Sequence, residues 1–239
     1  MSILTDSLSA GAAELGIELS EKELQQFEKY YLMIVQTNKK VNLTAIVEEK
    51  DVAVKHFIDA LTCLKAAPFG RAMSILDVGS GAGLPGIPVK ICRPDLKVTL
   101  IDSLDKRVNF LKEAIKELGL EQIEAFHVRI EDLGRNKDYR EKYDRVLARA
   151  VANLGVLAEY CLPPLKEDGL FIAMKGPRPE EEIKRAEKAI AVLGGALEKT
   201  VALRLPLTGE ERSLVIIRKV KSSPEKYPRR AGIPAKNPL

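Results

Sequence analysis

The chain has 239 residues, of which 46% are hydrophobic and 30% charged, with a formal net charge of +4. This length suffices for one α/β domain with a full core and a small appendage. No stretch approaches the roughly 20 apolar residues that span a bilayer, so we expect no membrane partner. Residues 1–15 lack the features of a secretory signal, which predicts a cytoplasmic protein. The odd number and apolar surroundings of the cysteines predict reduced core thiols at Cys63, Cys92 and Cys161.

The positive charge is concentrated at the carboxyl end. Residues 219–239 contain six Lys or Arg and a single acid, so this segment carries +5 and the rest of the chain −1. Such a tail suits an anionic polymer such as nucleic acid, and a solubilising tail would have the same composition. Four prolines predict disorder in the absence of that partner, at Pro224, Pro228, Pro234 and Pro238.

The first third of the chain has helical periodicity. Ser20 and Glu23 form a capping box at the start of one helix. Its buried face is predicted to carry Leu24, Phe27, Tyr31 and Val35. A second amphipathic helix is expected over residues 49–66, after a short non-periodic loop at 41–44.

From residue 74 onward, short apolar runs alternate with helical patterns. The expected strands cover residues 75–78, 96–101, 123–128, 145–148, 169–174, 197–205 and 213–219. Ser103 is expected to cap the helix after the second strand, and another helix is expected over 153–162. This alternation predicts an α/β fold with a doubly wound, mostly parallel sheet. The short link between the last two strands predicts an antiparallel pair at one edge.

These patterns divide the chain into three parts. Residues 1–66 form a helical cap, residues 67–220 form the sheet domain, and residues 221–239 form the basic tail. We expect one compact unit overall.

The most specific local pattern is the loop DVGSGAGLPG at residues 77–86, between a strand and a helix. Its last three glycines, with Asp102 following about 20 residues later, match the dinucleotide fingerprint. Its first acid and three glycines match the first motif of Rossmann-like methyltransferases equally well. Asp77 favours the second reading, because a carboxylate would repel a pyrophosphate and attract the cationic S-adenosylmethionine. Asp102 can accept hydrogen bonds from both ribose hydroxyls of either ligand.

Three functions remain open on these residues. The first is a methyltransferase that uses S-adenosylmethionine. The second is an NAD-dependent oxidoreductase, which Asp77 and the lack of a plausible hydride-transfer residue disfavour. The third is a non-catalytic RNA-binding or ribosome-assembly factor, which the intact loop disfavours.

Several segments together resemble one family. They are residues 77–88 (DVGSGAGLPGIP), residues 100–111 (LIDSLDKRVNFL), Asn42-Leu43-Thr44, and Arg149-Ala150 after the fourth strand. They are similar to the bacterial 16S rRNA guanine-N7 methyltransferases, the RsmG family, first named glucose-inhibited division protein B. The similarity runs nearly end to end, including His56-x-x-Asp59, Lys175-Gly176 and Arg229-Arg230.

This resemblance implies a fold, a cofactor and a substrate. The fold would be a Rossmann-like class I methyltransferase with a seven-stranded sheet and an N-terminal helical extension. S-adenosylmethionine would be the methyl donor, without a metal. The acceptor would be a guanine in the 530 loop of 16S rRNA, in naked RNA or in the 30S subunit. We expect a monomer that does not bind DNA.

Candidate site residues follow from the strand ends and from the resemblance. The cofactor is expected to contact Asp77, Gly79, Gly81, Gly83, Leu84, Asp102, Ile130, Glu131 and Arg149. Guanine N7 carries a free lone pair, so its methylation needs alignment and no general base. Residues predicted to provide that alignment are Arg149, Arg129 and Lys175. Residues predicted to contact RNA are Asn42, Lys106, Arg107, Arg212, Arg229 and Arg230.

Two further expectations concern His56 and the C-terminal tail. His56 is predicted to be a partly buried structural histidine that bonds Asp59 one turn on. Truncation after Val220 is predicted to weaken RNA binding and to flatten its salt dependence.

Overall fold

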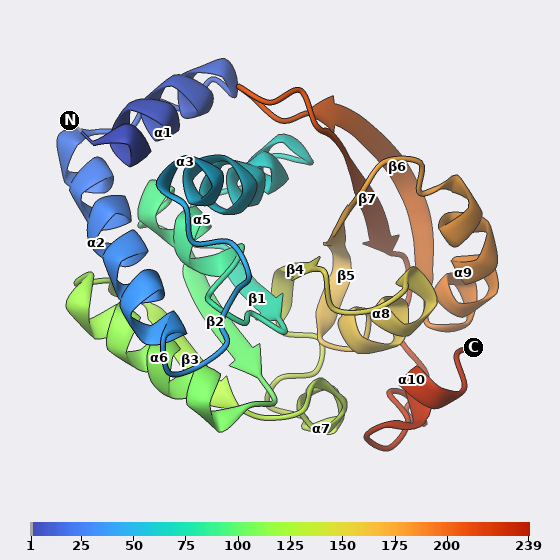
Figure 1. The fold of residues 1–239 in the computed structure, drawn as a ribbon. Coiled ribbons are helices and arrows are strands. Elements are labelled where there is room, and N and C mark those ends of the chain that lie inside the picture. The colour runs from blue at the N-terminus through green and yellow to red at the C-terminus, as the bar shows by residue number, and fades with distance from the viewer. Residues whose placement is uncertain (1) are drawn as a thin grey trace.

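A computed structural model describes residues 2–239 as a sheet with helices on both faces (Figure 1). The strands are β1 (Ser74–Val78), β2 (Lys97–Asp102), β3 (Ile123–His127), β4 (Tyr143–Arg149), β5 (Leu165–Lys175), β6 (Gly195–Arg204) and β7 (Glu211–Lys219). They lie in the order β3-β2-β1-β4-β5-β7-β6. Strands β1 to β5 are parallel, and β7 runs antiparallel to both β5 and β6. The predicted α/β sheet with an antiparallel edge is therefore confirmed.

Helices link the strands and cover the sheet. The longer ones are α1 (Ile3–Glu14), α2 (Glu21–Asn38), α5 (Gly86–Cys92), α6 (Asp105–Glu117), α8 (Leu154–Cys161) and α9 (Glu180–Val192). The shorter ones are α3 (Glu49–Val52), α4 (Asp59–Leu61), α7 (Ile130–Arg135) and α10 (Ile233–Lys236). No helix among residues 2–239 is both long and apolar enough to cross a membrane.

Alternate strand residues supply two hydrophobic cores, one on each face of the sheet. Leu147 packs with the N-terminal helices, α5 and α6, whereas its neighbour Val146 packs with α7, α8 and α9. Side chains of a strand point alternately to opposite faces, so a strand buried on both sides is apolar throughout. This arrangement explains the unbroken apolar runs of the central strands.

The N-terminal helix α2 begins as the sequence predicts. The Ser20 backbone N–H donates to the Glu23 carboxylate at 2.7 Å, and the Glu23 N–H donates to the Ser20 hydroxyl. The predicted buried face is off by one residue in its second half. Phe27, Tyr30 and Ile34 are the buried side chains, while Tyr31 is only partly covered and donates to the Val47 carbonyl.

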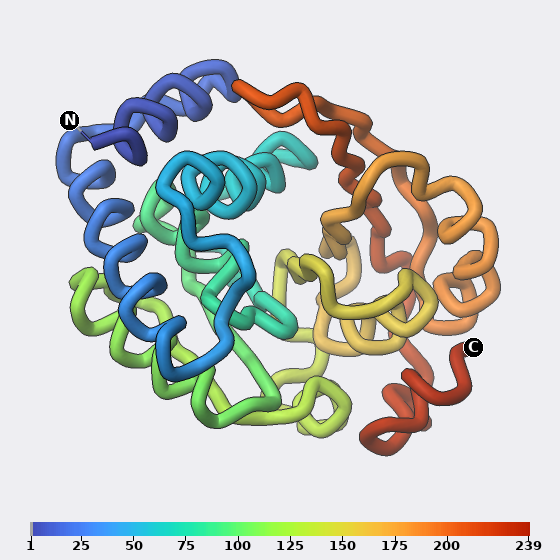
Figure 2. Tube along the Cα trace, in the orientation of Figure 1, coloured from blue at the N-terminus to red at the C-terminus, as the bar shows by residue number. Residues whose placement is uncertain are grey.

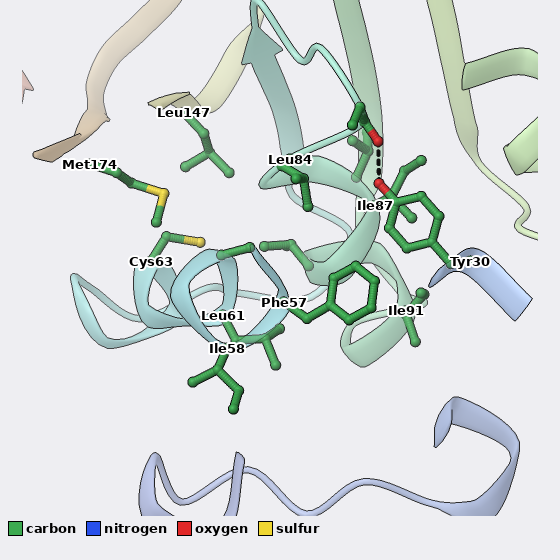
Figure 3. Close-up of a cluster of buried hydrophobic side chains, with 14 of the residues drawn as sticks. Tyr30, Phe57, Ile58, Leu61, Cys63, Leu84, Ile87, Ile91, Leu147 and Met174 are labelled. Atoms are coloured by element: carbon green, nitrogen blue, oxygen red, sulfur yellow. Dashed lines mark hydrogen bonds between the residues drawn. The ribbon is translucent and has the colours of Figure 1, made fainter. Parts of the chain in front are cut away.

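The expected helix over 49–66 is not a regular α-helix. Helix α3 leads into a π-helical turn, η1 (Ala53–Ile58), followed by α4 and a 3₁₀ turn, η2 (Thr62–Lys65). Figure 3 shows Phe57 of this segment beside Tyr30, and their rings stack with centroids 5.2 Å apart. π-helical turns occur often at functional sites, and hydrophobic periodicity does not reveal them.

Two local expectations are corrected. Ser103 does not cap α6, because Leu104 is the N-cap residue and its N–H donates to the Asp102 carboxylate at 2.9 Å. The C-terminal segment, expected to be disordered, packs on the domain, with Ser223, Tyr227, Pro228 and Pro234 buried. All three cysteines are free, with Cys63 and Cys161 buried as expected and Cys92 partly covered.

Candidate functional site

The carboxyl ends of β1 to β5 meet along one edge of the sheet, as parallel strands require. Ligands of open α/β sheets bind at this edge. Because β7 is antiparallel to β5, its start lies at the same edge, with Ser213 opposite Lys175. Arg212 and Lys175 therefore come together from distant parts of the sequence.

Two glycines of the loop after β1 occupy conformations that favour glycine. Gly79 has φ +68°, and a Cβ there would lie 2.8 Å from Val151. Gly83 has φ +93°, and a Cβ there would lie 2.7 Å from the Tyr30 hydroxyl, which donates to the Ala82 carbonyl. The loop is therefore held between the segment after β4 and helix α2, and packing as well as ligand approach requires these glycines.

Asp77 lies beneath this loop and not on its surface. Its side chain is fully buried, and its Oδ2 accepts the Gly86 N–H at 2.9 Å. Among the described residues, Oδ1 has no hydrogen-bond partner. Burial raises the pKa of this carboxyl to about 7. Asp77 thus supports the loop from below and keeps one buried acceptor without a partner.

Asp102, at the end of β2, organises the neighbouring loop. Its carboxylate accepts the Gly81 N–H at 3.0 Å and the Leu104 N–H at 2.9 Å. Arg107 of α6 lies 3.6 Å from the same carboxylate. Each carboxylate oxygen has a further lone pair, so Asp102 can also accept from a ligand. Arg107, predicted to contact RNA, is placed to balance this acid.

One pocket, of about 260 Å³, follows the ends of β1 to β4. We call it the glycine-loop pocket; it is lined by Val78, Gly79, Ile101, Asp102, Ser103, Val128, Arg129, Ile130, Glu131, Val151, Ala152, Tyr160, Gly232 and Ala235. Four of the predicted cofactor residues line it, namely Gly79, Asp102, Ile130 and Glu131. The remaining predicted loop residues, Asp77, Gly81, Gly83 and Leu84, do not line it.

A second pocket, of about 380 Å³, follows the ends of β4, β5 and the start of β7. We call it the basic pocket; it is lined by Lys55, His56, Asp59, Thr62, Arg149, Ala150, Met174, Lys175, Gly176, Arg212, Ser213 and Leu214. It brings together the predicted residues Arg149, Lys175 and Arg212. The predicted Arg129 is not among them, since it lines the glycine-loop pocket.

Consecutive residues at the end of β4 line the two pockets. Arg149 and Ala150 line the basic pocket, and the next two residues, Val151 and Ala152, line the glycine-loop pocket. Ala150 has φ +56°, a left-handed conformation that a residue with a Cβ seldom adopts. The backbone is strained at the junction between the pockets, as is common where a site requires a sharp change of direction.

Acidic partners hold the cations of the basic pocket. Arg149 Nη1 lies 2.9 Å from Asp59 Oδ2, and Arg212 Nε lies 3.1 Å from Asp59 Oδ1. The Lys175 ammonium donates to the Ala152 carbonyl at 2.9 Å and to Glu182 at 2.7 Å. Asp59 is nearly buried, so it positions both guanidinium groups from the pocket wall.

His56 has a different partner from the one predicted. Its Nε2 lies 2.7 Å from the Thr44 hydroxyl, and its Nδ1 lies 3.1 Å from the Lys55 carbonyl. Asp59 is instead taken by the two arginines. Burial lowers the pKa of His56 to about 4, so the ring is neutral near pH 7.

The remaining predicted RNA contacts lie outside both pockets. Asn42, Lys106 and Arg230 are exposed. Arg229 is not free in this structure, because its guanidinium pairs with the buried Glu159 carboxylate at 2.6 Å. Among residues 2–239, no group of three or more His, Cys, Asp or Glu side chains is placed to hold a metal ion.

This geometry can be compared with known proteins. The family model for rRNA small subunit methyltransferase G matches residues 23–215. The chain belongs to this family. It is 57% identical over 239 residues to ribosomal RNA small subunit methyltransferase G of Pelotomaculum thermopropionicum, covering 100% of both chains. It is 48% identical over 234 residues to the protein of that name from Bacillus subtilis, covering 98% of both.

Solved structures agree on the fold of this family member. A SAM-dependent methyltransferase from Aquifex aeolicus aligns with a TM-score of 0.52 at 20% identity, over 72% of this chain and 94% of that chain. TrmN from Thermus thermophilus aligns with a TM-score of 0.52 at 22% identity, over 68% of this chain and 48% of that chain. The predicted Rossmann-like methyltransferase fold is thereby confirmed.

Sequence reasoning missed several residues that line the pockets, among them Lys55, Asp59, Tyr160, Gly232 and Ala235. Asp59 was assigned only to His56, and Tyr160, Gly232 and Ala235 were given no role. A signal existed for Asp59, since a polar residue on an otherwise apolar helix face requires a partner. The sequence holds no comparable signal for Gly232 and Ala235, because their place depends on how the tail folds back.

Proposed function

We propose that this protein transfers the methyl group of S-adenosylmethionine to N7 of a guanine in the 530 loop of 16S rRNA. The observation that carries the proposal is the junction of an acid-bearing pocket and a basic pocket at the end of β4. One pocket suits a cofactor and the other suits a segment of an anionic polymer. Membership of the rRNA small subunit methyltransferase G family supports the same donor and acceptor.

The glycine-loop pocket fits the adenosine half of S-adenosylmethionine. Asp102 has lone pairs for the two ribose hydroxyls, and Ile130 offers an apolar surface to the adenine ring. The cofactor carries an ammonium and a sulfonium but no phosphate. Its positive charge would favour the ionised form of Asp77, whose buried Oδ1 lacks a partner. A pyrophosphate in the same place would have the opposite effect.

The basic pocket fits a flipped-out guanine and its phosphates. Lys55, Arg149 and Arg212 can contact phosphate oxygens or the base, with strength that falls as salt rises. Asp59 is the acid of this wall, and its oxygens keep lone pairs after pairing with the arginines. A carboxylate can accept from the N1–H and amino group of guanine, whereas adenine has no N1–H. That orientation would leave N7 free to face the methyl donor.

The reaction requires alignment from these residues and no proton transfer. The bound cofactor supplies an electrophilic methyl group on its sulfonium. Guanine N7 would form the new N–C bond with its lone pair as the S–CH3 bond breaks and S-adenosylhomocysteine leaves, and no hydrogen would leave N7. We assign Arg149 and Lys175 the role of holding the base so that N7 lies in line with the methyl–sulfur bond. Such positioning is the main way in which a site without a general base speeds the reaction. The neutral His56 need not act as a base.

A labelled methyl-transfer assay tests the proposal. The donor is S-adenosylmethionine with a labelled methyl group, and the acceptor is the 30S subunit lacking the modification. Asp102→Asn should weaken cofactor binding by roughly 10-fold or more, because each charge-assisted hydrogen bond contributes about 1.5–3 kcal/mol. Asp105→Asn is the matched control, since Asp105 is an exposed acid nearby on α6.

Each result of this assay has a distinct meaning. Labelled RNA with the wild type and the control, and weak labelling with Asp102→Asn, would support the proposal. Binding of NAD in place of S-adenosylmethionine would refute the cofactor assignment. Tight cofactor binding without label on 16S rRNA would refute the assignment of 16S rRNA as the substrate.

A further inference from the structure

The C-terminal segment forms one side of the glycine-loop pocket. Gly232 and Ala235 line this pocket together with Asp102 and Gly79, although they lie more than 100 residues further along the chain. Figure 2 shows the end of the chain folded back beside α7 and α8, and α10 packs on α8. A pocket wall in this position faces whatever binds next to Asp102.

Specific hydrogen bonds fix the segment in this place. Arg140 donates to the Tyr227 carbonyl at 2.7 Å and to the Ser223 carbonyl at 2.5 Å. Arg229 makes four hydrogen bonds to the Glu159 carboxylate, three from its guanidinium and one from its backbone N–H. Since the Glu159 side chain is 1% exposed, its charge has no solvent to replace this partner. The segment is therefore docked by buried polar contacts and not only by its prolines.

One of these hydrogen bonds reaches the wall of the pocket itself. The Gly232 N–H donates to Glu131 Oε1 at 2.9 Å, and the Tyr160 hydroxyl lies 3.3 Å from the same oxygen. Glu131 follows β3, is one of the residues predicted to contact the cofactor, and is 4% exposed. The carboxylate of Glu131 is thus engaged by the C-terminal segment. Gly232 and Ala235 of this segment line the pocket beside it.

We propose that residues 223–237 are a part of the cofactor site, in which Gly232 and Ala235 contact the adenosine half of S-adenosylmethionine. The inference rests on the proposed function for the identity of the ligand. Because the ligand contacts this segment only when the segment is docked, cofactor binding and docking stabilise each other. This role differs from the RNA contact predicted for Arg229, which is committed to Glu159.

The test inserts a bulky side chain into the pocket wall. Ala235→Phe places a ring at an exposed position that lines the pocket, so the core is untouched. Lys236→Phe is the matched control, because Lys236 is exposed on the same short helix and does not line the pocket. Calorimetric titration with S-adenosylmethionine gives the dissociation constant of each full-length variant, and thermal unfolding checks that both fold.

The expected result is at least a tenfold weaker affinity for Ala235→Phe, with Lys236→Phe near the wild type. Equal affinities for the two variants would overturn the inference. Failure of the wild type to bind S-adenosylmethionine would instead refute the proposed function, so the two failures are distinguishable.

A second pair of variants tests the coupling between docking and binding. Arg229→Ala leaves Glu159 without its partner and should release the segment, whereas Arg230→Ala removes an exposed side chain. Hydrogen exchange of residues 223–237 should slow on addition of S-adenosylmethionine to the wild type. Arg229→Ala should abolish that protection and weaken cofactor affinity, and Arg230→Ala should do neither. If Arg229→Ala released the segment but left the affinity for S-adenosylmethionine unchanged, the coupling between docking and binding would be contradicted.

Discussion

The buried carboxyl of Asp77 should make the stability of this protein fall as pH rises. Burial raises its pKa from 3.8 to about 7, so the folded protein holds this proton more tightly than the unfolded chain. Stability decreases with pH wherever the folded state binds more protons than the unfolded state. The decrease therefore occupies the window between these two pKa values. Asp77→Asn, which cannot ionise, lacks this contribution.

The size of the effect follows from the width of the window. Each pH unit within it changes the free energy of unfolding by about 1.4 kcal/mol for a single proton. Between pH 5 and the folded pKa near 7, wild type should lose about 2 kcal/mol relative to Asp77→Asn. Asp77 is fully buried, so solvent screening does not reduce this value. The contribution of His56 is common to both proteins and cancels in the comparison.

Urea denaturation of the cofactor-free protein across this pH range measures the difference. Asp77→Asn adds a buried amide without an assured partner, which lowers its stability by a constant amount at every pH. The prediction therefore concerns the slope of the difference and not its absolute value. Asp105→Asn, at an exposed acid, should follow the wild-type curve. A difference between wild type and Asp77→Asn that does not change with pH would refute the reasoning.

Three further predictions concern the remaining parts of the site. Relative to His56→Gln, the wild type should lose about 2 kcal/mol of stability between pH 6.5 and pH 5, because burial lowers the folded pKa of His56 to about 4; the Asp77 contribution is common to both proteins and cancels, and urea denaturation measures the difference. Gly79→Ala should weaken cofactor affinity in a titration, since a Cβ there meets a neighbouring side chain, whereas Gly119→Ala, with a similar φ and open space, should not. Arg212→Ala should lower the salt slope of RNA binding by about one, and Arg204→Ala, an exposed arginine outside the pocket, should leave it unchanged.

The sheet and the edge that carries the site could be predicted from sequence. Buried parallel strands require continuous apolar runs, and these runs fixed the order of strands and helices along the chain. The antiparallel edge was predicted from one short link, and it explains why Arg212 reaches Lys175. Local sequence patterns are enough to predict a strand or helix where its own hydrophobic periodicity determines which residues are buried.

The two features that sequence did not predict depend on contacts across the fold. The π-helical turn before Asp59 is not visible in hydrophobic periodicity, so the pairing of Asp59 with two arginines was missed. The basic tail was expected to be disordered because its composition resembles a solvated segment. Its order comes from Glu159, a buried acid on α8 that requires a cation, and the sequence does not say which acid is buried.

Identifying the atom that receives the methyl group tests the central claim most directly. After reaction of wild-type protein with S-adenosylmethionine and unmodified 30S subunits, the 16S rRNA is digested to nucleosides and the methylated product is compared with standards. We predict 7-methylguanosine, because N7 has a free lone pair and the basic pocket offers alignment by Arg149 and Lys175. A methyl group on the amino nitrogen of guanine or of adenine would contradict the account, since those nitrogens carry protons that must be removed.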